Sequence, residues 1–191
     1  MRRLLLDTSS LFYRAFFALP DSIRGPDGRP TNAIHGYLNM TAQLIRTRGP
    51  EQVVHALDDD WKPAPRVASY SGYKSQRPDE PKEITDQFQV LFELLPQTGM
   101  TVADAEGWEA EDAIGSLVAK TKGRDRDEVV TGDRDLIQLV RDPHVRVLLT
   151  RKGVSDLADM DRSAVEERFG VPADRYADFA ILRGDPSDAL P

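Results

Sequence analysis

Nine acidic residues that could bind metal ions fall in five groups along the chain, mostly where an apolar segment ends or a helix begins. They are Asp7; Asp58; Glu109, Glu111 and Asp112; Asp133 and Asp135; and Asp185 and Asp188. Carboxylates do not share a pocket at neutral pH unless cations offset their charge, because repulsion and desolvation would reprotonate them. If the fold brings these groups together, we expect a site for hard divalent cations with oxygen ligands. Since the set contains no His or Cys, Mg²⁺ or Mn²⁺ suits it better than zinc.

The spacing within the groups suits two neighbouring ions rather than one. In a helix that begins near Glu109, the side chains of Glu109 and Asp112 share a face, and Glu111 is offset from Asp112 by roughly 100°. Asp133 and Asp135 follow a glycine and could bracket an ion from a loop. Two ions ~4 Å apart activate a water on one side and stabilise the leaving oxygen on the other. That is the chemistry of phosphodiester hydrolysis.

Any one of these acids also has an ordinary interpretation. A single Asp after a strand most often caps a helix or lies in a solvated turn, and we assign Asp59 and Asp60 to that role. Nine acids with consistent positions favour an ion site over a set of unrelated caps. His55 lies within an apolar segment and is expected in the core.

A segment rich in cations and aromatic residues follows Asp58 closely, and we call residues 61–78 the basic segment. It contains four cations, three aromatic residues and no acid. We predict that its cations meet phosphates and its aromatic rings stack on unpaired bases. Lys74 and Arg77, beside Tyr73, are the strongest candidates for gripping the phosphate that is cut. The alternative is a solvated loop with ordinary Lys and Arg side chains.

Short apolar segments alternate with helical patterns, and these elements must position the acids. We expect strands at residues 3–6, 52–57, 101–102, 128–131 and 145–149. We expect helices at residues 11–19, 31–46, 82–95 (ended by Pro96), 110–120, 136–139, 163–169 and 173–182. The alternation predicts an α/β fold with a mostly parallel sheet. Because Asp7, Asp58 and Asp133 each follow a strand, we expect all three at the carboxyl edge of the sheet, where such folds bind ligands.

Composition limits the class of protein. The chain has 191 residues, 40% apolar and 30% charged, which is a normal balance for a folded domain. It has no cysteine, which excludes disulfides and thiolate metal sites and suits a reducing, cytoplasmic location. No apolar run approaches the ~20 residues needed to cross a bilayer, so no membrane association is expected. The net charge of −7 argues only weakly against a nucleic-acid partner, because the chain without the nine acids is slightly basic.

Six segments occur in a characteristic order. They are LLLDTSSLFYRAFFALP, TNAIHGYLNM, YSGYKSQRP, GWEAEDAIGSL, VVTGDRDLIQLV and ILRGDPSDALP. Together they resemble the 5′-nuclease family, which includes the 5′-nuclease domain of bacterial DNA polymerase I, its stand-alone relatives and the flap endonucleases. The resemblance covers nearly the whole chain and implies a PIN-like α/β fold with two divalent ions. We expect the protein to act as a monomer. It also implies hydrolysis of DNA at 5′ ends, nicks and 5′ flaps, and of RNA primers paired to DNA, in replication and repair.

The resemblance further implies roles for individual residues. The expected ligands of the first ion are Asp7, Asp58, Glu109 and Glu111. Those expected around the second ion, some of them through water, are Asp112, Asp133, Asp135, Asp185 and Asp188. The expected DNA contacts are Arg14, Arg66, Tyr73, Lys74 and Arg77, and the expected catalytic set is Lys74, Arg77 and Asp133. Tyr73, Lys74 and Arg77 match a basic helix of an arch, about residues 61–95, through which the 5′ single strand passes.

The chain departs from the family pattern in two ways. The family usually has two aspartates where this chain has Glu111 and Asp112, and the extra methylene moves one carboxylate outward by about 1.5 Å. The family also continues past the equivalent of Asp188 into a glycine-rich, helix-hairpin-helix-like module, often with K⁺, that grips duplex DNA. We therefore expect residues 1–191 to form one catalytic domain of a longer protein, with weak duplex binding of its own.

Three other functions remain open at this point. A PIN-type ribonuclease would use the same ions on RNA, but such domains are generally shorter and lack the basic segment. A non-catalytic DNA-binding remnant of the fold would have lost carboxylates, and here every expected position is acidic. A phosphatase with an aspartyl nucleophile usually has Asp-x-Asp after its first strand, whereas Asp7 is followed by Thr8 and Ser9.

Overall fold

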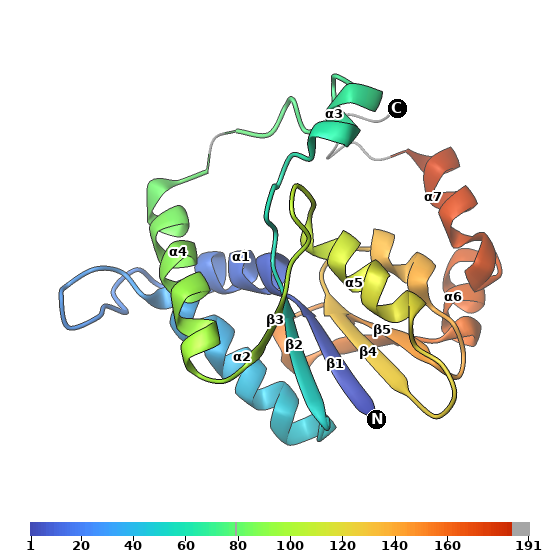
Figure 1. Ribbon diagram of the computed structural model, residues 1–191, viewed down its shortest axis with the longest axis horizontal. Helices are drawn as coiled ribbons and strands as arrows, with labels where there is room; N and C mark the ends of the chain where they lie inside the picture. Colours follow the sequence, from blue (N-terminus) through green and yellow to red (C-terminus); the bar gives the residue numbers. More distant parts are fainter. Residues whose placement is uncertain (79, 185–191) are drawn as a thin grey trace.

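The three consecutive leucines at positions 4–6 lie in the centre of a sheet that is buried on both faces. The computed structural model describes residues 1–78 and 80–184, and within them the sheet has six strands. They are β1 (Arg2–Asp7), β2 (Gln52–Ala56), β3 (Thr101–Ala103), β4 (Arg126–Thr131), β5 (Val145–Thr150) and β6 (Leu157–Met160). The strand order is β3-β2-β1-β4-β5-β6, and every neighbouring pair is parallel except β5 and β6 (Figure 1). The predicted α/β fold with a mostly parallel sheet is confirmed.

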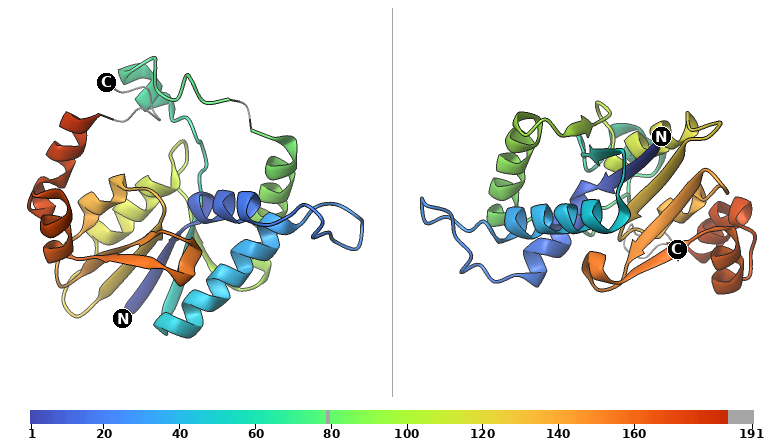
Figure 2. Two further views of the ribbon diagram at one scale, coloured as in Figure 1. Left: turned by 180° about the vertical axis from the view of Figure 1, so that it is seen from behind. Right: turned by 90° about the horizontal axis from the view of Figure 1, so that it is seen from below.

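Helices cover both faces of this sheet (Figures 1 and 2). On one face lie α1 (Thr8–Ala18), α2 (Asn32–Arg48) and α4 (Lys82–Gln97), and on the other α5 (Ala110–Ala119), α6 (Arg162–Phe169) and α7 (Tyr176–Arg183). Leu4 and Leu6 belong to the same buried cluster as Tyr37 of α2, whereas Leu5 belongs to the cluster of Ile114 of α5. This is why β1 appears in the sequence as a continuous apolar run. In the described part of the chain, no helix is long and apolar enough to cross a bilayer.

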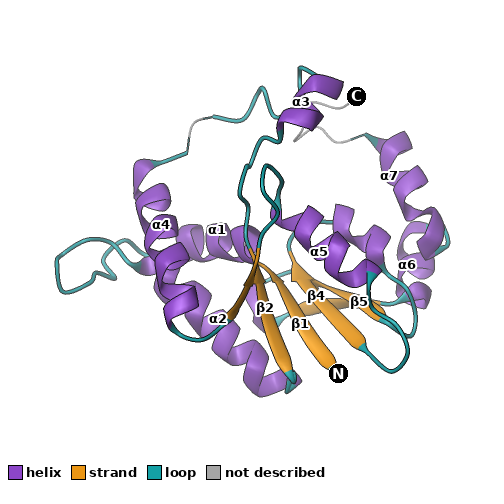
Figure 3. Cartoon of the chain, viewed as in Figure 1, coloured by secondary structure: helices purple, strands orange, loops and turns teal. Residues whose placement is uncertain are grey.

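The basic segment leaves the sheet after β2 and rises above the carboxyl edge before the chain returns at α4 (Figure 3). It contains one short helix, α3 (Ala64–Ser69), followed by turns over residues 71–76. The expected basic helix at Tyr73–Arg77 is therefore wrong, since the helical part lies earlier. Lys74 has φ = 50°, in the left-handed region that a right-handed helix cannot include.

Three further elements differ from expectation. α4 continues to Gln97, so Pro96 lies in its last turn and does not end it. A proline so close to the end removes only one backbone hydrogen bond. The edge strand β6 was not expected, because four residues are too few to show a pattern. The helix expected at residues 173–182 is divided into a 3₁₀ turn, η3 (Ala173–Arg175), and α7; two other 3₁₀ segments are η1 (Asp135–Leu139) and η2 (Gly153–Ser155).

His55 of β2 is a buried histidine held in its neutral form. Its side chain is fully buried, as predicted, and its Nδ1 lies 2.5 Å from the Tyr37 hydroxyl. The same hydroxyl lies 3.0 Å from the Thr8 hydroxyl. Burial lowers the pKa of His55 from 6.5 to about 4. Protonation of this side chain therefore opposes folding.

We expect the contribution of His55 to stability to fall as the pH drops from about 6.5 to about 4, because in that window the unfolded chain binds a proton that folded His55 does not. One pKa unit is worth about 1.4 kcal/mol, so His55 alone accounts for a loss of about 3 kcal/mol at the acid end. Urea unfolding across this range measures the effect. Relative to the wild type, His55→Gln should gain stability progressively as the pH falls through this window, whereas His35→Gln, at an exposed site on α2, should show no such pH-dependent difference. If the free energy of unfolding depends on pH in the same way in all three proteins, this assignment is contradicted.

Candidate metal and nucleic-acid site

The carboxyl ends of the three central strands bring acids into one cleft. β2, β1 and β4 are neighbours; Asp7 ends β1, and Asp58 and Asp133 each lie two residues after their strands. The cleft has a volume of about 740 Å³. Six of the nine predicted ligands line it: Asp7, Asp58, Glu109, Glu111, Asp133 and Asp135. Asp112 lies in the first turn of α5, and Asp185 and Asp188 lie outside the described residues.

Asp7 is a buried carboxylate that accepts two hydrogen bonds. Its Oδ1 accepts from the backbone N–H of Ser10 (3.2 Å), which caps α1, and its Oδ2 accepts from the Thr131 hydroxyl (2.6 Å). Burial raises the pKa of Asp7 to about 7; the two hydrogen bonds oppose the rise, and the charges of Asp58 and Asp133 add to it. The charged form of Asp7 is therefore costly, and a nearby cation would remove that cost.

Two hydroxyl side chains hold the acids in place, and neither was predicted from the sequence. Thr131 donates to Asp7 and accepts from the backbone N–H of Asp133 (2.8 Å), so it links two acidic groups. The Ser9 hydroxyl donates to Asp58 (2.6 Å). Each hydroxyl lies within two residues of a candidate ligand, in DTSS and VVTGD, which was the available signal. Small polar residues at strand ends are usually helix caps, and this hid their role.

Backbone amides complete this framework. Asp58 accepts from the N–H of Ala110 (2.7 Å), at the start of α5, and Asp133 accepts from the N–H of Asp135 (2.8 Å). The first of these bonds places a carboxylate at a helix N-terminus, where the helix dipole favours it. The acids from the sheet and from α5 are thereby fixed relative to one another.

Arg66 of α3 lies among the acids at the start of α5. Its Nη1 donates to Glu109 and to Glu111, the latter at 2.5 Å, and its Nη2 donates to both oxygens of Asp112 (2.9 and 3.0 Å). Burial raises the pKa of Glu111 to about 7, the charge of Arg66 lowers it, and the charges of Glu109 and Asp133 raise it further. Three carboxylates thus converge on one guanidinium group.

Tyr73 and Lys74 of the basic segment are buried against Glu109. The Tyr73 hydroxyl donates to Glu109 Oε2 (2.7 Å), and Lys74 Nζ donates to Oε1 of the same residue and to the backbone oxygen of Trp61 (3.0 Å). The charged groups of Arg66 and Lys74 also lie 5.7 and 5.1 Å from the centroid of the Tyr73 ring. The solvated-loop alternative is therefore wrong for these residues, because they fold onto the acids.

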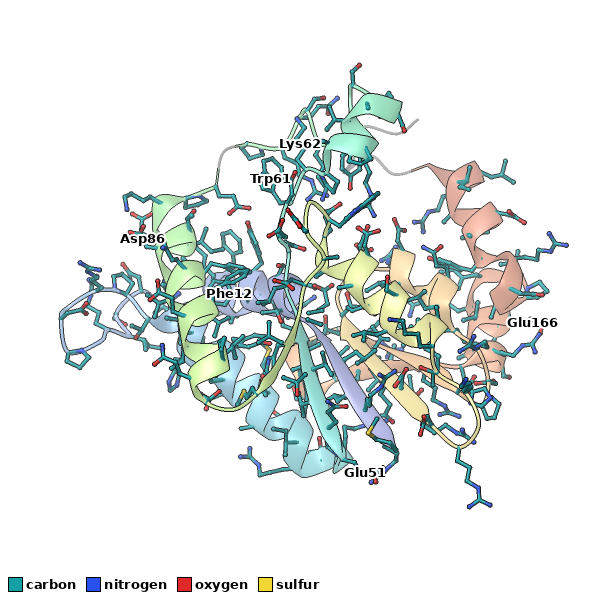
Figure 4. All side chains as sticks on the ribbon, in the orientation of Figure 1. Phe12, Glu51, Trp61, Lys62, Asp86 and Glu166 are labelled. Atoms are coloured by element: carbon teal, nitrogen blue, oxygen red, sulfur yellow. The ribbon has the colours of Figure 1, made fainter. Side chains whose placement is uncertain are left out.

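The two other predicted DNA contacts occupy different places. Arg77 lines the cleft. Arg14 of α1 lies towards the end of β5, where it donates to the backbone oxygens of Thr150 and Arg151 (3.5 and 3.4 Å). Figure 4 shows Trp61 and Lys62, at the start of the basic segment, between the sheet and α3. The cleft therefore has acids below and the basic segment above.

The donor set fits a hard divalent cation. All the acids lining the cleft offer oxygen ligands, and the pKa values of Asp7 and Glu111 are both raised by burial and by neighbouring carboxylates. Within residues 1–78 and 80–184, no three His, Cys, Asp or Glu side chains are grouped tightly enough to hold an ion as they stand. Arg66 and Lys74 contact oxygens that an ion would use, so these side chains would have to move.

Comparison with known proteins identifies the family. The sequence pattern of the 5′-3′ exonuclease, N-terminal resolvase-like domain, matches residues 2–170. The chain belongs to this family. A 5′-3′ exonuclease of Streptomyces coelicolor is 42% identical, over 98% of this chain and 66% of its own length. DNA polymerase I of Mycobacterium bovis is also 42% identical, over 98% of this chain and 21% of its own length. The exonuclease domain therefore spans only part of these relatives, and the family predicted from the six segments is confirmed.

Solved structures of low sequence identity share the fold of this exonuclease domain. The bacteriophage T5 flap endonuclease, in a pseudo-enzyme-product complex with DNA and metal ions, gives a TM-score of 0.73 at 18% identity, covering 99% of this chain and 68% of that one. A T5 5′-exonuclease with bound zinc gives a TM-score of 0.74 at 18% identity, covering 99% and 69%. At these identities the likeness concerns the fold alone.

Proposed function

We propose that the protein is a divalent-ion-dependent 5′-3′ exonuclease and 5′-flap endonuclease that hydrolyses DNA phosphodiesters in replication and repair. The observation that carries this proposal is one cleft lined both by acids suited to divalent ions and by Arg66, Lys74 and Arg77 of the basic segment. Membership of the exonuclease family supports it. So does the T5 flap endonuclease, which has the same fold and was solved with DNA and metal ions.

The acids divide into two proposed ion sites for Mg²⁺ or Mn²⁺. The first comprises Asp7, Asp58, Glu109 and Glu111. The second comprises Asp112, Asp133 and Asp135, together with Asp185 and Asp188. When bound, such a pair of ions supplies a hydroxide nucleophile and stabilises the leaving oxygen.

The side chains of the cleft have complementary tasks in this proposal. Thr131 keeps Asp7 and Asp133 at a fixed separation through its two hydrogen bonds. Lys74 and Arg77 offset the charge of the phosphate that is cut. The guanidinium of Arg66 presents its N–H donors in one plane, in a geometry that can bind two oxygens of a phosphate group. The basic segment thus guides a strand towards the acids.

The proposed substrates are DNA with 5′ flaps, nicks or free 5′ ends, and RNA paired to DNA. The working unit is proposed to be a monomer. Duplex binding is assigned to a helix-hairpin-helix-like module with K⁺ in the full-length protein, outside this chain. The same acidic cleft serves all these substrates, because the reaction at the phosphodiester is the same.

Removal of divalent ions should abolish cleavage of a 5′-flap DNA. We expect no product in EDTA and full recovery when Mg²⁺ or Mn²⁺ is added in excess, because the acids then regain the cations that offset their charge. The measurement is gel analysis of a labelled flap substrate with the full-length protein. Cleavage that persists in EDTA would contradict a metal-dependent reaction.

The same assay separates DNA cleavage from the ribonuclease alternative. A single-stranded RNA of the same length is compared with the flapped DNA under identical ion concentrations. Preference for the flap by at least tenfold, or about 1.4 kcal/mol in transition-state free energy, supports the proposal. Preference for the RNA would favour a PIN-type ribonuclease.

A further inference from the structure

Arg66 is a cation bound among the acids at the start of α5. Its guanidinium contacts four carboxylate oxygens from Glu109, Glu111 and Asp112. The Arg66 guanidinium is permanently charged and presents its donors in a rigid plane. A guanidinium and a divalent cation held by the same carboxylates carry like charges, so they repel each other at this short range. The guanidinium and a divalent cation therefore compete for these carboxylates.

Polar contacts, rather than apolar packing, hold α3 onto the cleft. α3 is six residues long, and no residue of the helix is buried. Arg66 is its link to α5, and the neighbouring Tyr73 and Lys74 both bind Glu109. Because no residue of α3 is buried, the loss of the carboxylates as partners would free α3 from the site.

We propose that Arg66 acts as a displaceable plug of the two ion sites, which keeps the basic segment closed until divalent cations take Glu111 and Asp112. The inference rests on the proposed function for the identity of the ion. Displacement leaves Arg66 with free donors next to a newly bound cation, so ion loading and readiness to bind a phosphate become linked. By reciprocity, any variant that opens the basic segment must bind cations more tightly.

The test uses hydrogen exchange and calorimetry on the protein without DNA, so it does not depend on activity. In the wild type, saturating Mg²⁺ should accelerate amide exchange of residues 64–74 by about tenfold or more, within the usual range of coupling between two sites. In Arg66→Gln these amides should exchange rapidly with and without Mg²⁺. Its affinity for Mg²⁺ should rise about tenfold for the same reason.

Lys62→Gln is the matched control. Lys62 belongs to the same segment and carries the same charge, and among the described residues the ion pairs of these acids are with Arg66 and Lys74, not with Lys62. If Lys62→Gln tightens Mg²⁺ binding as much as Arg66→Gln does, the tighter binding comes from the loss of any positive charge in the segment, and the proposed plug is wrong. Unchanged exchange in the wild type at saturating Mg²⁺ overturns it as well, without recourse to any variant. If no protein binds Mg²⁺ at all, both the plug and the proposed ion chemistry fail.

Discussion

Asp133→Asn is expected to lower cleavage of a 5′-flap DNA by at least roughly 100-fold, since even the partners of metal ligands typically contribute 10- to 100-fold. Asp133 lines the cleft, and its charge adds to the raised pKa of both Asp7 and Glu111. Asparagine has the same shape and still accepts the bond from the Asp135 amide, so the loop should persist. Single-turnover cleavage with saturating Mg²⁺ measures the effect.

The control for this variant is Asp104→Asn, which removes an exposed carboxylate between β3 and α5. It should cleave like the wild type. Without divalent ions, Asp133→Asn should unfold at the same temperature as the wild type or higher, because a repulsion among buried acids has been removed. An Asp133→Asn protein that retains more than about a tenth of the wild-type rate would exclude Asp133 from the proposed ion site, given the minimum loss expected of a ligand.

The strands that carry the acids could be predicted because they are buried on both faces. Residues 4–6 and the pair Val129 and Val130 are short apolar runs that stop at polar residues, and in a parallel sheet such runs end at one edge. β6 could not be predicted in this way. It lies at the sheet edge, is antiparallel and alternates buried and partly exposed side chains over only four residues. A pattern that short does not distinguish a strand from a loop.

The composition of the site could also be predicted, but not its contacts. The acids could be identified because they follow predicted strands or begin a predicted helix. The partners of Arg66, in contrast, lie 43 to 46 residues away from it in the chain. That pairing depends on how the basic segment folds back over the sheet, for which no local pattern exists. The segment has the composition of a phosphate-binding surface, and in the structure two of its cations bind the carboxylates at the start of α5. The same charge that suits a nucleic acid thus closes the cleft.

Arg3→Met is expected to destabilise the fold by about 3 kcal/mol, because breaking a buried ion pair leaves an uncompensated charge. Arg3 of β1 lies opposite Asp127 of β4, and its Nε and Nη2 donate to the two oxygens of that carboxylate, both at 2.7 Å. The Asp127 side chain is fully buried and also accepts from the Thr121 hydroxyl. Once Arg3 is replaced, Thr121 alone remains to satisfy a buried negative charge. Urea unfolding at neutral pH measures the loss.

The double variant decides whether the charge is the cause. Asp127→Asn in the Arg3→Met background removes the uncompensated negative charge and keeps an acceptor for the Thr121 hydroxyl, so it should recover at least half of the lost stability. The single substitutions should then be strongly non-additive, by more than about 1 kcal/mol, as residues in direct contact are. Additive effects would show that Arg3 contributes through its aliphatic packing instead. This pair joins β1 to β4 at Arg3 and Asp127, which lie four residues before Asp7 and six residues before Asp133. At a low temperature, where Arg3→Met is still folded, its rate of flap cleavage should therefore equal that of the wild type.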